Sequence, residues 1–185
     1  MDIAGLDKFD FQELSRKLYN IYVMHRNMKI RPLQKIDINN TSKVHKAAFV
    51  RQKMSKAWIE SNAKAFPRVQ YFVAENQDNE IVGYIQWTQK SGFRPEVVLE
   101  LEQLAVLPKY QGKGIGTKLI KESLPQIKSH IAKRDATIKH IIVTTRSDNY
   151  AQALYRKVIG AEVEATISNL YSADEVFMIA RNIKI

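Results

Sequence analysis

The sequence predicts one α/β domain in which a central mixed β-sheet is flanked by helices, with an added helix at the N-terminus. Strand-like and helix-like segments alternate through the middle of the chain, and two strand-like segments follow each other at its end. This order is typical of a single mixed sheet covered by helices. No internal repeat, low-complexity run or interdomain linker divides the 185 residues, and a domain of this size buries about 70% of its unfolded surface.

Composition excludes several classes of function. The 29 Lys and Arg residues against 19 Asp and Glu give a net charge of +10, but they are scattered, which indicates a solvated surface and not a nucleic-acid interface. Cysteine is absent, so disulfides, thiolate metal sites and a thiol nucleophile are excluded. The histidines show no HxxxH or HxH spacing, and we expect no metal site. No apolar run approaches a membrane span, and the acidic start lacks a signal-peptide pattern, so we expect a cytoplasmic protein without a membrane partner.

A helix is predicted over residues 7–26. Asp10 and Glu13 have the spacing of a helix start. The apolar and aromatic side chains that recur at helical intervals are Phe11, Leu14, Leu18, Ile21, Tyr22 and His25. We therefore divide the chain into an N-terminal helical extension, residues 1–27, and a domain of residues 28–185. We expect the extension to cover either the flank of its own domain or a second subunit of a homodimer.

A short strand and two helices are predicted next. The strand covers Met28–Leu33. Helices are expected at 39–50, started by the cap-forming residues 39–42, and at 52–65, ended by Pro67. These helices share an apolar and aromatic face that is more typical of core than of a substrate wall and that comprises Phe49, Met54, Trp58, Ile59 and Phe66.

The centre of the chain predicts a hairpin, a central strand and a long helix. Alternating strands at 69–74 and 81–88 flank a polar turn and form the hairpin. The central strand covers 97–107 and ends at a proline. Pro125 interrupts the amphipathic segment that follows, so we expect a kink or a restart of the helix there.

The last third of the chain predicts a strand, a helix and a strand pair. The β-branched run at 138–145 is a buried strand. A helix then runs to about Lys157 and is ended by Gly160. The closing strands cover 161–167 and 175–183, separated by a polar loop.

Three glycines in alternation, Gly112, Gly114 and Gly116, separate the central strand from the long helix. Glycine lets backbone N–H groups turn inward with no Cβ in the way, and the helix presents its unpaired N-terminal donors to the same point. A phosphate or pyrophosphate is the natural ligand of such a loop. The spacing matches neither the Walker pattern GxxxxGK[ST] nor the dinucleotide pattern GxGxxG.

Two stretches carry a resemblance to a known family. Residues 100–106 read ELEQLAV and lead into QGKGIG at 111–116, while 149–155 read NYAQALY. They resemble the QxxGxG loop and the NxxAxxxYxxxGF helix of the GNAT superfamily of N-acetyltransferases, and the order of elements matches the GNAT fold from about residue 28 to 183. The chain departs from the second motif by one extra residue before Gly160 and by Ala161, where an aromatic residue is usual.

The resemblance implies an N-acetyltransferase that uses acetyl-CoA as co-substrate and no metal. The residues that it assigns to the cofactor are Leu104, Ala105, Val106, Gln111, Gly112, Lys113, Gly114, Ile115, Gly116, Thr117 and Asn149. The backbone of 104–106 would hold the pantetheine amides and polarise the thioester, and 111–117 would bind the pyrophosphate. Arg146, Arg156 or Lys157 would meet the 3′-phosphate, although surface charge explains them equally well.

Acetyl transfer to an amine needs a base, an oxyanion site and an acid. Glu100 lies eleven residues before Gln111, the spacing at which several members of the family carry their base. Glu102, on the same strand face by two-residue periodicity, is the alternative, and ordered water is a third. Tyr155 stands where the family would use a tyrosine to protonate the CoA thiolate.

The expected reaction is direct attack of a primary amine, from a small molecule or a protein, on acetyl-CoA in a ternary complex. Two alternatives stay open: a non-catalytic acyl-CoA-binding regulatory module, and an acetyltransferase that acts on an aminoacyl-tRNA or a ribosomal protein. The acceptor side would be built by residues 40–70, the hairpin and the loop at 168–174. No motif in these segments identifies the amine.

Overall fold

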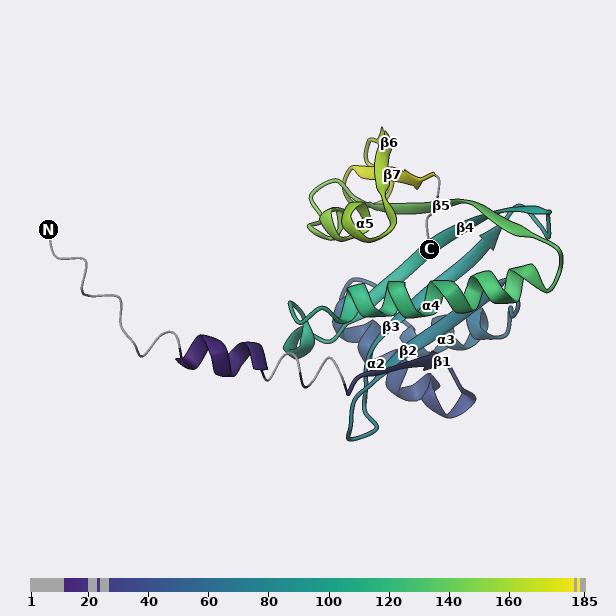
Figure 1. Cartoon of the computed structure of the whole chain (residues 1–185). Coiled ribbons are helices and arrows are strands. Elements are labelled where there is room, and N and C mark those ends of the chain that lie inside the picture. Colours follow the sequence, from purple (N-terminus) through teal and green to yellow (C-terminus); the bar gives the residue numbers. More distant parts are fainter. Residues whose placement is uncertain (1–11, 20–22, 24–26, 182, 184–185) are drawn as a thin grey trace, which may run out of the picture.

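The computed structural model describes residues 12–19, 23, 27–181 and 183. Residues 12–19 are helical, as predicted, and the rest of the helix expected at 7–26 lies almost entirely outside the described residues. In Figure 1 this helix stands apart from the sheet, in purple.

The described residues form one mixed sheet of seven strands in the order β1-β2-β3-β4-β5-β7-β6. Its strands are β1 (Lys29–Pro32), β2 (Val69–Glu75), β3 (Ile81–Lys90), β4 (Glu96–Val106), β5 (Thr137–Arg146), β6 (Ala161–Ile167) and β7 (Glu175–Ala180). Within this described sheet β4 and β5 run parallel and the other neighbours are antiparallel. The predicted fold class is confirmed, and each expected strand is present within a few residues of its predicted bounds.

Helices cover both faces of the sheet (Figure 1). They are α2 (Ile38–Ala48), α3 (Ser55–Ala63), α4 (Ile115–Ala132) and α5 (Ala151–Ile159), with short 3-10 turns η1 (Lys35–Asp37) and η2 (Pro108–Tyr110). The larger apolar core lies between the sheet and α4 with α5. A smaller core lies on the opposite face, where α2 and α3 pack on β2 and β3. Helices α4 and α5, which follow β4 and β5 in the chain, therefore lie on the same face of the sheet.

The start of α2 differs from its prediction. The cap-forming residues 39–42 lie inside the helix, which begins after Asp37. Asp37 accepts hydrogen bonds from the backbone N–H of Gln34 at 2.7 Å and from Arg31 Nη1 at 2.6 Å. Arg31 Nε also donates to Glu75 at 2.7 Å. This long-range ion cluster, which local sequence does not reveal, sets the helix start.

Of the kink or restart predicted at Pro125, the restart does not occur, because α4 continues through this residue. A proline inside a helix costs about 3 kcal/mol, largely from the lost hydrogen bond to the carbonyl four residues earlier. Pro125 lies on the exposed face of α4, where water can bind the Lys121 carbonyl. The buried face of the same helix offsets this cost with Leu119, Ile120, Leu124, Ile127 and Ile131.

The apolar face predicted as core on α2 and α3 is largely exposed. Ile59 is fully buried, but Met54, Trp58 and Phe66 are 77%, 41% and 62% exposed. The reason is that α3 packs on β2, near the edge of the sheet, so one side of the helix meets strands and the other meets solvent.

Candidate functional site

The parallel strands β4 and β5 part halfway along β4. Their pairing runs from Glu96 to Glu100 on β4 and ends opposite Ile142. Beyond that point β5 continues beside β7, while β4 extends to Val106 with β3 as its neighbour. The backbone groups of Leu104–Val106 that face away from β3 are therefore not paired with β5, and such groups need another partner.

The glycine loop closes one end of this gap. Gly112 and Gly114 adopt φ of 70° and 78°, a left-handed conformation that side chains with a Cβ rarely adopt. Gly114 is the N-cap of α4, and the first hydrogen bond of the helix runs from Lys118 N to Gly114 O. The N–H groups of 115–117 thus have no acceptor within the helix, and they point to the loop as donors for an anion.

Gln111 and Gly116 fit the loop to its surroundings. Gln111 Nε2 donates to Val106 O at 2.9 Å, which ties the loop to the end of β4. A Cβ on Gly116 would lie 3.2 Å from Leu154 Cδ2, so glycine allows α4 and α5 to approach each other.

The gap between the strands is a cleft of about 530 Å³. It is lined by Ala47, Ala48, Phe49, Leu104, Ala105, Val106, Tyr110, Gln111, Gly112, Gly114, Ile115, Gly116, Thr117, Asn149, Tyr150, Ala151, Leu154 and Tyr155. Every residue predicted to bind the cofactor is among them except Lys113. The Lys113 ammonium donates instead to Lys109 O at 2.8 Å and lies over the Tyr110 ring.

Sequence reasoning missed several residues of the cleft wall. Tyr150, Ala151 and Leu154 belong to the same helical motif as Asn149 and Tyr155, and helical spacing would have placed them on the same side. The end of α2, including Phe49, reaches the cleft from far away in the sequence. No local pattern marks that contact.

Asn149 lies two residues before α5, and Tyr155 lies in the middle of this helix. Asn149 Nδ2 donates to Thr145 Oγ1 at 2.8 Å, and its Oδ1 accepts the N–H of Ala151 at 2.9 Å, so the side chain ties α5 to the end of β5. Tyr155 is 6% exposed. Burial raises its pKa to about 12, so the phenol stays protonated at neutral pH and can donate a proton.

Glu100 and Glu102 lie on β4 before the cleft and are not among its lining residues. Glu100 Oε2 is 2.8 Å from Lys90 Nζ. Glu102 is the extra residue of a β-bulge, because Gln103 pairs with Gln86 and Leu101 with Trp87. Desolvation of its carboxyl and the neighbouring negative charge of Glu100 raise the pKa of Glu102. The two carboxyl groups are neighbours, as the sequence predicted, but their environments differ.

The bulge turns Gln103 toward α2 and α3, into a buried polar cluster that the sequence did not predict. Gln103 Oε1 accepts hydrogen bonds from Tyr84 OH at 2.8 Å and from Trp58 Nε1 at 3.3 Å. The His45 ring lies 3.5 Å from Gln103 Nε2. Burial lowers the pKa of His45, so the ring is neutral. This cluster holds β4 where the cleft begins.

Two loops face each other near the cleft. Arg51, between α2 and α3, donates from Nη1 to Ser172 Oγ, between β6 and β7, at 2.8 Å. Val50 and Tyr171 on these loops and Tyr150 on the cleft wall are all exposed. Exposed apolar side chains therefore lie beside the hydrogen bond that joins the two loops.

Among the basic residues named for a 3′-phosphate, two are engaged elsewhere. Arg146 pairs with Asp148 at 2.7 Å and Arg156 with Glu162 at 3.1 Å. These pairs favour the surface-charge explanation of both arginines. Across the described part of the chain, no group of three or more His, Cys, Asp or Glu side chains could hold a metal ion. None of the described helices has the length and apolarity to cross a membrane.

Comparison with known proteins agrees with this geometry. The family model described as "Acetyltransferase (GNAT) family" matches residues 37–161. An N-alpha-acetyltransferase of Saccharolobus solfataricus is 30% identical over 112 residues, which cover 56% of this chain and 64% of that protein. The matched part thus spans less than two thirds of that relative.

Solved structures share the fold. The ribosomal-protein-S18-alanine N-acetyltransferase from Escherichia coli is 18% identical, with a TM-score of 0.65 over 85% of this chain and 96% of that chain. An aminoglycoside 6′-N-acetyltransferase complexed with coenzyme A is 17% identical, with a TM-score of 0.65 over 85% of this chain and 98% of that chain. At these identities the likeness concerns the fold.

Proposed function

The chain belongs to the acetyltransferase (GNAT) family, and we propose that it transfers an acetyl group from acetyl-CoA to the α-amino group of a polypeptide. The observation that carries the proposal is the cleft between the parted strands, which joins unpaired backbone groups, a glycine loop at a helix N-terminus and a protonated tyrosine. A phosphate-bearing thioester needs these three features together.

The cleft suits the parts of acetyl-CoA in order. The pyrophosphate would accept hydrogen bonds from the loop and from the first N–H groups of α4, where the helix dipole also favours negative charge. The amides of the pantetheine arm would pair with the backbone groups of Leu104–Val106 that face away from β3, apart from the Val106 carbonyl that Gln111 already occupies, as an added strand pairs with a sheet edge. Asn149 and Leu154 would face the arm from α5.

Glu102 is the better base of the two glutamates. The amine must lose a proton before its lone pair attacks, and a base works best when its pKa approaches the operating pH. The pKa of Glu102 is raised by desolvation and by Glu100, whereas Glu100 is bound to Lys90. Neither carboxyl group lines the cleft, so the proton would pass from the amine to Glu102 through water. Ordered water, the third candidate for the base, thus takes part in the same proton transfer.

Tyr155 would complete the reaction. As the amine nitrogen bonds to the thioester carbon, the carbonyl oxygen gains negative charge, which the backbone N–H groups of the parted β4 would stabilise. The carbon–sulfur bond then breaks, and the Tyr155 hydroxyl would give its proton to the thiolate. The tyrosinate would then take up the second proton, which the nitrogen releases after it has bonded to the carbon, and Tyr155 returns to its neutral form. No covalent enzyme intermediate is needed.

The two linked loops support a polypeptide as the acceptor. The exposed side chains of Val50, Tyr150 and Tyr171 offer apolar surface beside the cleft, which suits the side chains of a flexible chain end more than a compact polyamine. The neighbouring glutamates on β4 would attract its ammonium group. The relative from Saccharolobus solfataricus, by its name an N-alpha-acetyltransferase, points the same way.

An acceptor panel with CoA release as the readout tests the function. Peptides of varied first residue, the same peptides with blocked α-amines, spermidine and an aminoglycoside would each be offered with acetyl-CoA. We expect release with free peptide α-amines alone, and mass spectrometry should place the acetyl group on the first residue. Release with spermidine alone would overturn the acceptor class, and CoA binding without release for any amine would favour the regulatory module.

A further inference from the structure

A second hollow lies between α2 and α3 and adjoins the cleft. It measures about 900 Å³, and four of the residues that line it are lysines: Lys43 and Lys46 of α2, Lys53 of the connecting loop and Lys56 of α3. We call it the lysine groove. Residues 47–49, which follow Lys46 directly, line the cleft. The two hollows therefore meet at the end of α2.

Positive charge is concentrated in this part of the chain. Residues 41–59 contain five Lys and Arg residues and neither Asp nor Glu. The four lysines of the groove are exposed, and among the described residues none of them forms an ion pair with a carboxylate. The acidic residue of the lining, Glu60, lies 3.9 Å from Lys64. The lysine groove thus offers a net positive surface to a ligand.

Hydrogen bonds fix the frame on which these lysines stand. The Phe49 N–H donates to His45 O at 2.8 Å, and the Gln52 N–H donates to Phe49 O at 2.9 Å. The His45 Nδ1 atom lies 3.0 Å from Ser55 Oγ, which joins the end of α2 to the start of α3. Because the backbone of the groove is already ordered, a ligand does not have to order it on binding, and such preorganisation favours affinity.

The lining of the lysine groove favours a polypeptide over a nucleic acid. Val50 and Met54 lie among the lysines and are 81% and 77% exposed, so they offer apolar contacts to side chains. Proteins that bind single-stranded nucleic acid stack the bases on aromatic side chains, and bidentate contacts to phosphate need arginine. Among the described residues that line the groove, none is aromatic and none is an arginine.

Opposite charges along the acceptor site would orient an acidic polypeptide. In the proposed reaction, its α-ammonium group is attracted by Glu100 and Glu102 on β4, and carboxylates farther along its chain would meet the lysines. A helix is about 10 Å across, and an extended chain covers this distance in about three residues. With its first residues at the cleft, the acceptor would bring the side chains of about positions 4–7 to the lysine groove.

We propose that the lysine groove binds acidic side chains at about positions 4–7 of the acceptor polypeptide, and so selects acceptors that carry an acidic stretch behind the acetylated residue. This inference rests on the proposed function, because it places the α-amino group of a polypeptide at the cleft. The lysines lie outside the cleft, so their contacts act on the binding of the acceptor and not on the chemical step.

Three peptides with the same first three residues test this inference. Positions 4–7 are Glu in the first peptide, Gln in the second and Lys in the third. We expect a KM for the Glu peptide about tenfold below that for the Gln peptide, with similar kcat, because each exposed ion pair changes an equilibrium by a factor of about two. Raising the salt concentration from about 0.05 M to about 0.5 M should remove most of this difference, since salt screens exposed charges.

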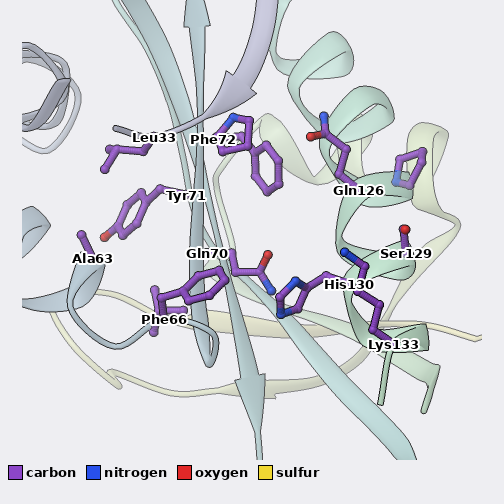
Figure 2. A pocket seen from close by; sticks show the side chains of 13 residues that line it. Leu33, Ala63, Phe66, Gln70, Tyr71, Phe72, Gln126, Ser129, His130 and Lys133 are labelled. Carbon is purple, nitrogen blue, oxygen red and sulfur yellow. The ribbon is translucent and has the colours of Figure 1, made fainter. Parts of the chain in front are cut away.

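Charge reversal separates the lysine groove from the overall charge of the protein. The double variant Lys46→Glu, Lys53→Glu should prefer the Lys peptide, a reversal that a folding defect cannot produce. The matched control Lys121→Glu, Lys133→Glu changes the net charge equally, but on α4, which covers the other face of the sheet. Figure 2 shows Lys133 on the α4 side of a separate hollow, across from Phe66. The control should keep the preference for the Glu peptide.

The possible results distinguish this inference from the proposed function. Acetylation of all three peptides with equal KM overturns the inference and leaves the proposed function intact. Acetylation of none of them, with CoA release for a small amine, overturns the proposed function, and the inference falls with it. Loss of the preference in the control as well as in the groove variant overturns the inference in favour of overall charge.

A binding measurement covers the nucleic-acid alternative. Fluorescence anisotropy would compare the labelled Glu peptide with a labelled short single-stranded RNA on the parent protein and on both double variants. We expect the groove variant to weaken binding of the Glu peptide and the control to leave it unchanged. Tighter binding of the RNA than of the Glu peptide, lost in the groove variant alone, overturns the inference in favour of a nucleic acid.

Discussion

Lys90 Nζ lies 2.8 Å from Glu100 Oε2, and this ion pair distinguishes two neighbouring glutamates that the sequence could not separate. Glu100 is paired with a cation. Its charge, after desolvation, is what raises the pKa of Glu102 two residues away. A carboxyl group whose pKa is raised, next to an ion-paired carboxyl group, is an arrangement found where proton transfer is tuned.

The two glutamates should therefore respond differently to substitution. Glu102→Gln removes the base and should lower kcat about 100-fold. Glu100→Gln keeps the base but removes a negative charge beside it, so the pKa of Glu102 falls and the acidic limb of the kcat/KM profile moves to lower pH, with kcat largely retained. Steady-state pH profiles of both variants measure this. The same loss of kcat in both, with no shift of the limb, would contradict the assignment.

Tyr155→Phe should affect turnover and not binding. The variant keeps the ring that lines the cleft and loses the proton donor, so kcat should fall about 100-fold. Calorimetry should give a CoA dissociation constant within a factor of about two of the parent value, because hydroxyl loss leaves the apolar contacts in place. Unchanged turnover would assign Tyr155 to packing.

Substitutions of glycine should separate the effect of backbone strain on stability from the effect of the glycine loop on CoA binding. Gly112→Ala places a Cβ at φ of +70°, where open space surrounds it, so the penalty is conformational, about 1 kcal/mol. Gly92→Ala is the matched control, with φ of +80° and equally open space. Both should lower thermal stability by similar amounts, but only Gly112→Ala should weaken CoA binding in calorimetry. Equal CoA affinity in the two variants would remove the loop from the CoA site.

The link between the two loops should influence the acceptor. Arg51→Ala removes the donor of the 2.8 Å hydrogen bond to Ser172, and a hydrogen bond of this kind contributes about 1 kcal/mol. The KM for a peptide acceptor should rise about fivefold, with the KM for acetyl-CoA unchanged. Ser172→Ala should have the same effect, and the double variant should add little to either. Fully additive effects would show that the two residues act separately.

The ion cluster before α2 should make stability sensitive to acid. Hydrogen bonds from Arg31 lower the pKa of Glu75, and although burial acts in the opposite direction, Arg31 and the Gln34 N–H lower the pKa of Asp37. A lowered folded-state pKa gives stability that is present above the unfolded values, about 4 for both groups, and that is lost as the pH falls through the folded values.

Arg31→Met should remove this contribution. Unpaired buried carboxylates should lower stability at neutral pH by about 3 kcal/mol, and the fall of Tm from neutral pH to acid should be smaller than in the parent. Calorimetric scans across that range measure both effects. An equally steep acid dependence in the variant would place the acid-sensitive groups elsewhere.

Local patterns predicted the parts of this protein that local physics controls. Alternating apolar and polar residues and runs of β-branched residues predicted the strands, because a strand in a sheet buries at least one of its faces. The left-handed turns at Gly112, Gly114 and Gly160 were visible because side chains with a Cβ rarely adopt them. The QxxGxG loop and the NYAQALY helix indicated the family because they are also local patterns. Both are short, and their spacing reflects contacts within one turn.

Contacts between distant segments escaped such reasoning. Nothing near Asp37 reveals that Arg31 and Glu75 set the start of α2, and nothing near Phe49 places it in the cleft wall. The bulge at Glu102 is defined by its pairing with β3, so the chemistry of that carboxyl is a property of the assembled sheet.

Reading the residues in order was enough for the fold, the family and the loop that would grip a phosphate, since these depend on backbone conformations encoded over a few positions. The order could not say which glutamate is paired, which cleft residues come from α2, or which apolar side chains near α3 stay exposed. Those outcomes depend on the balance of burial and charge between segments that meet only after folding, and that balance is set by distances across the sheet and not by spacing along the chain.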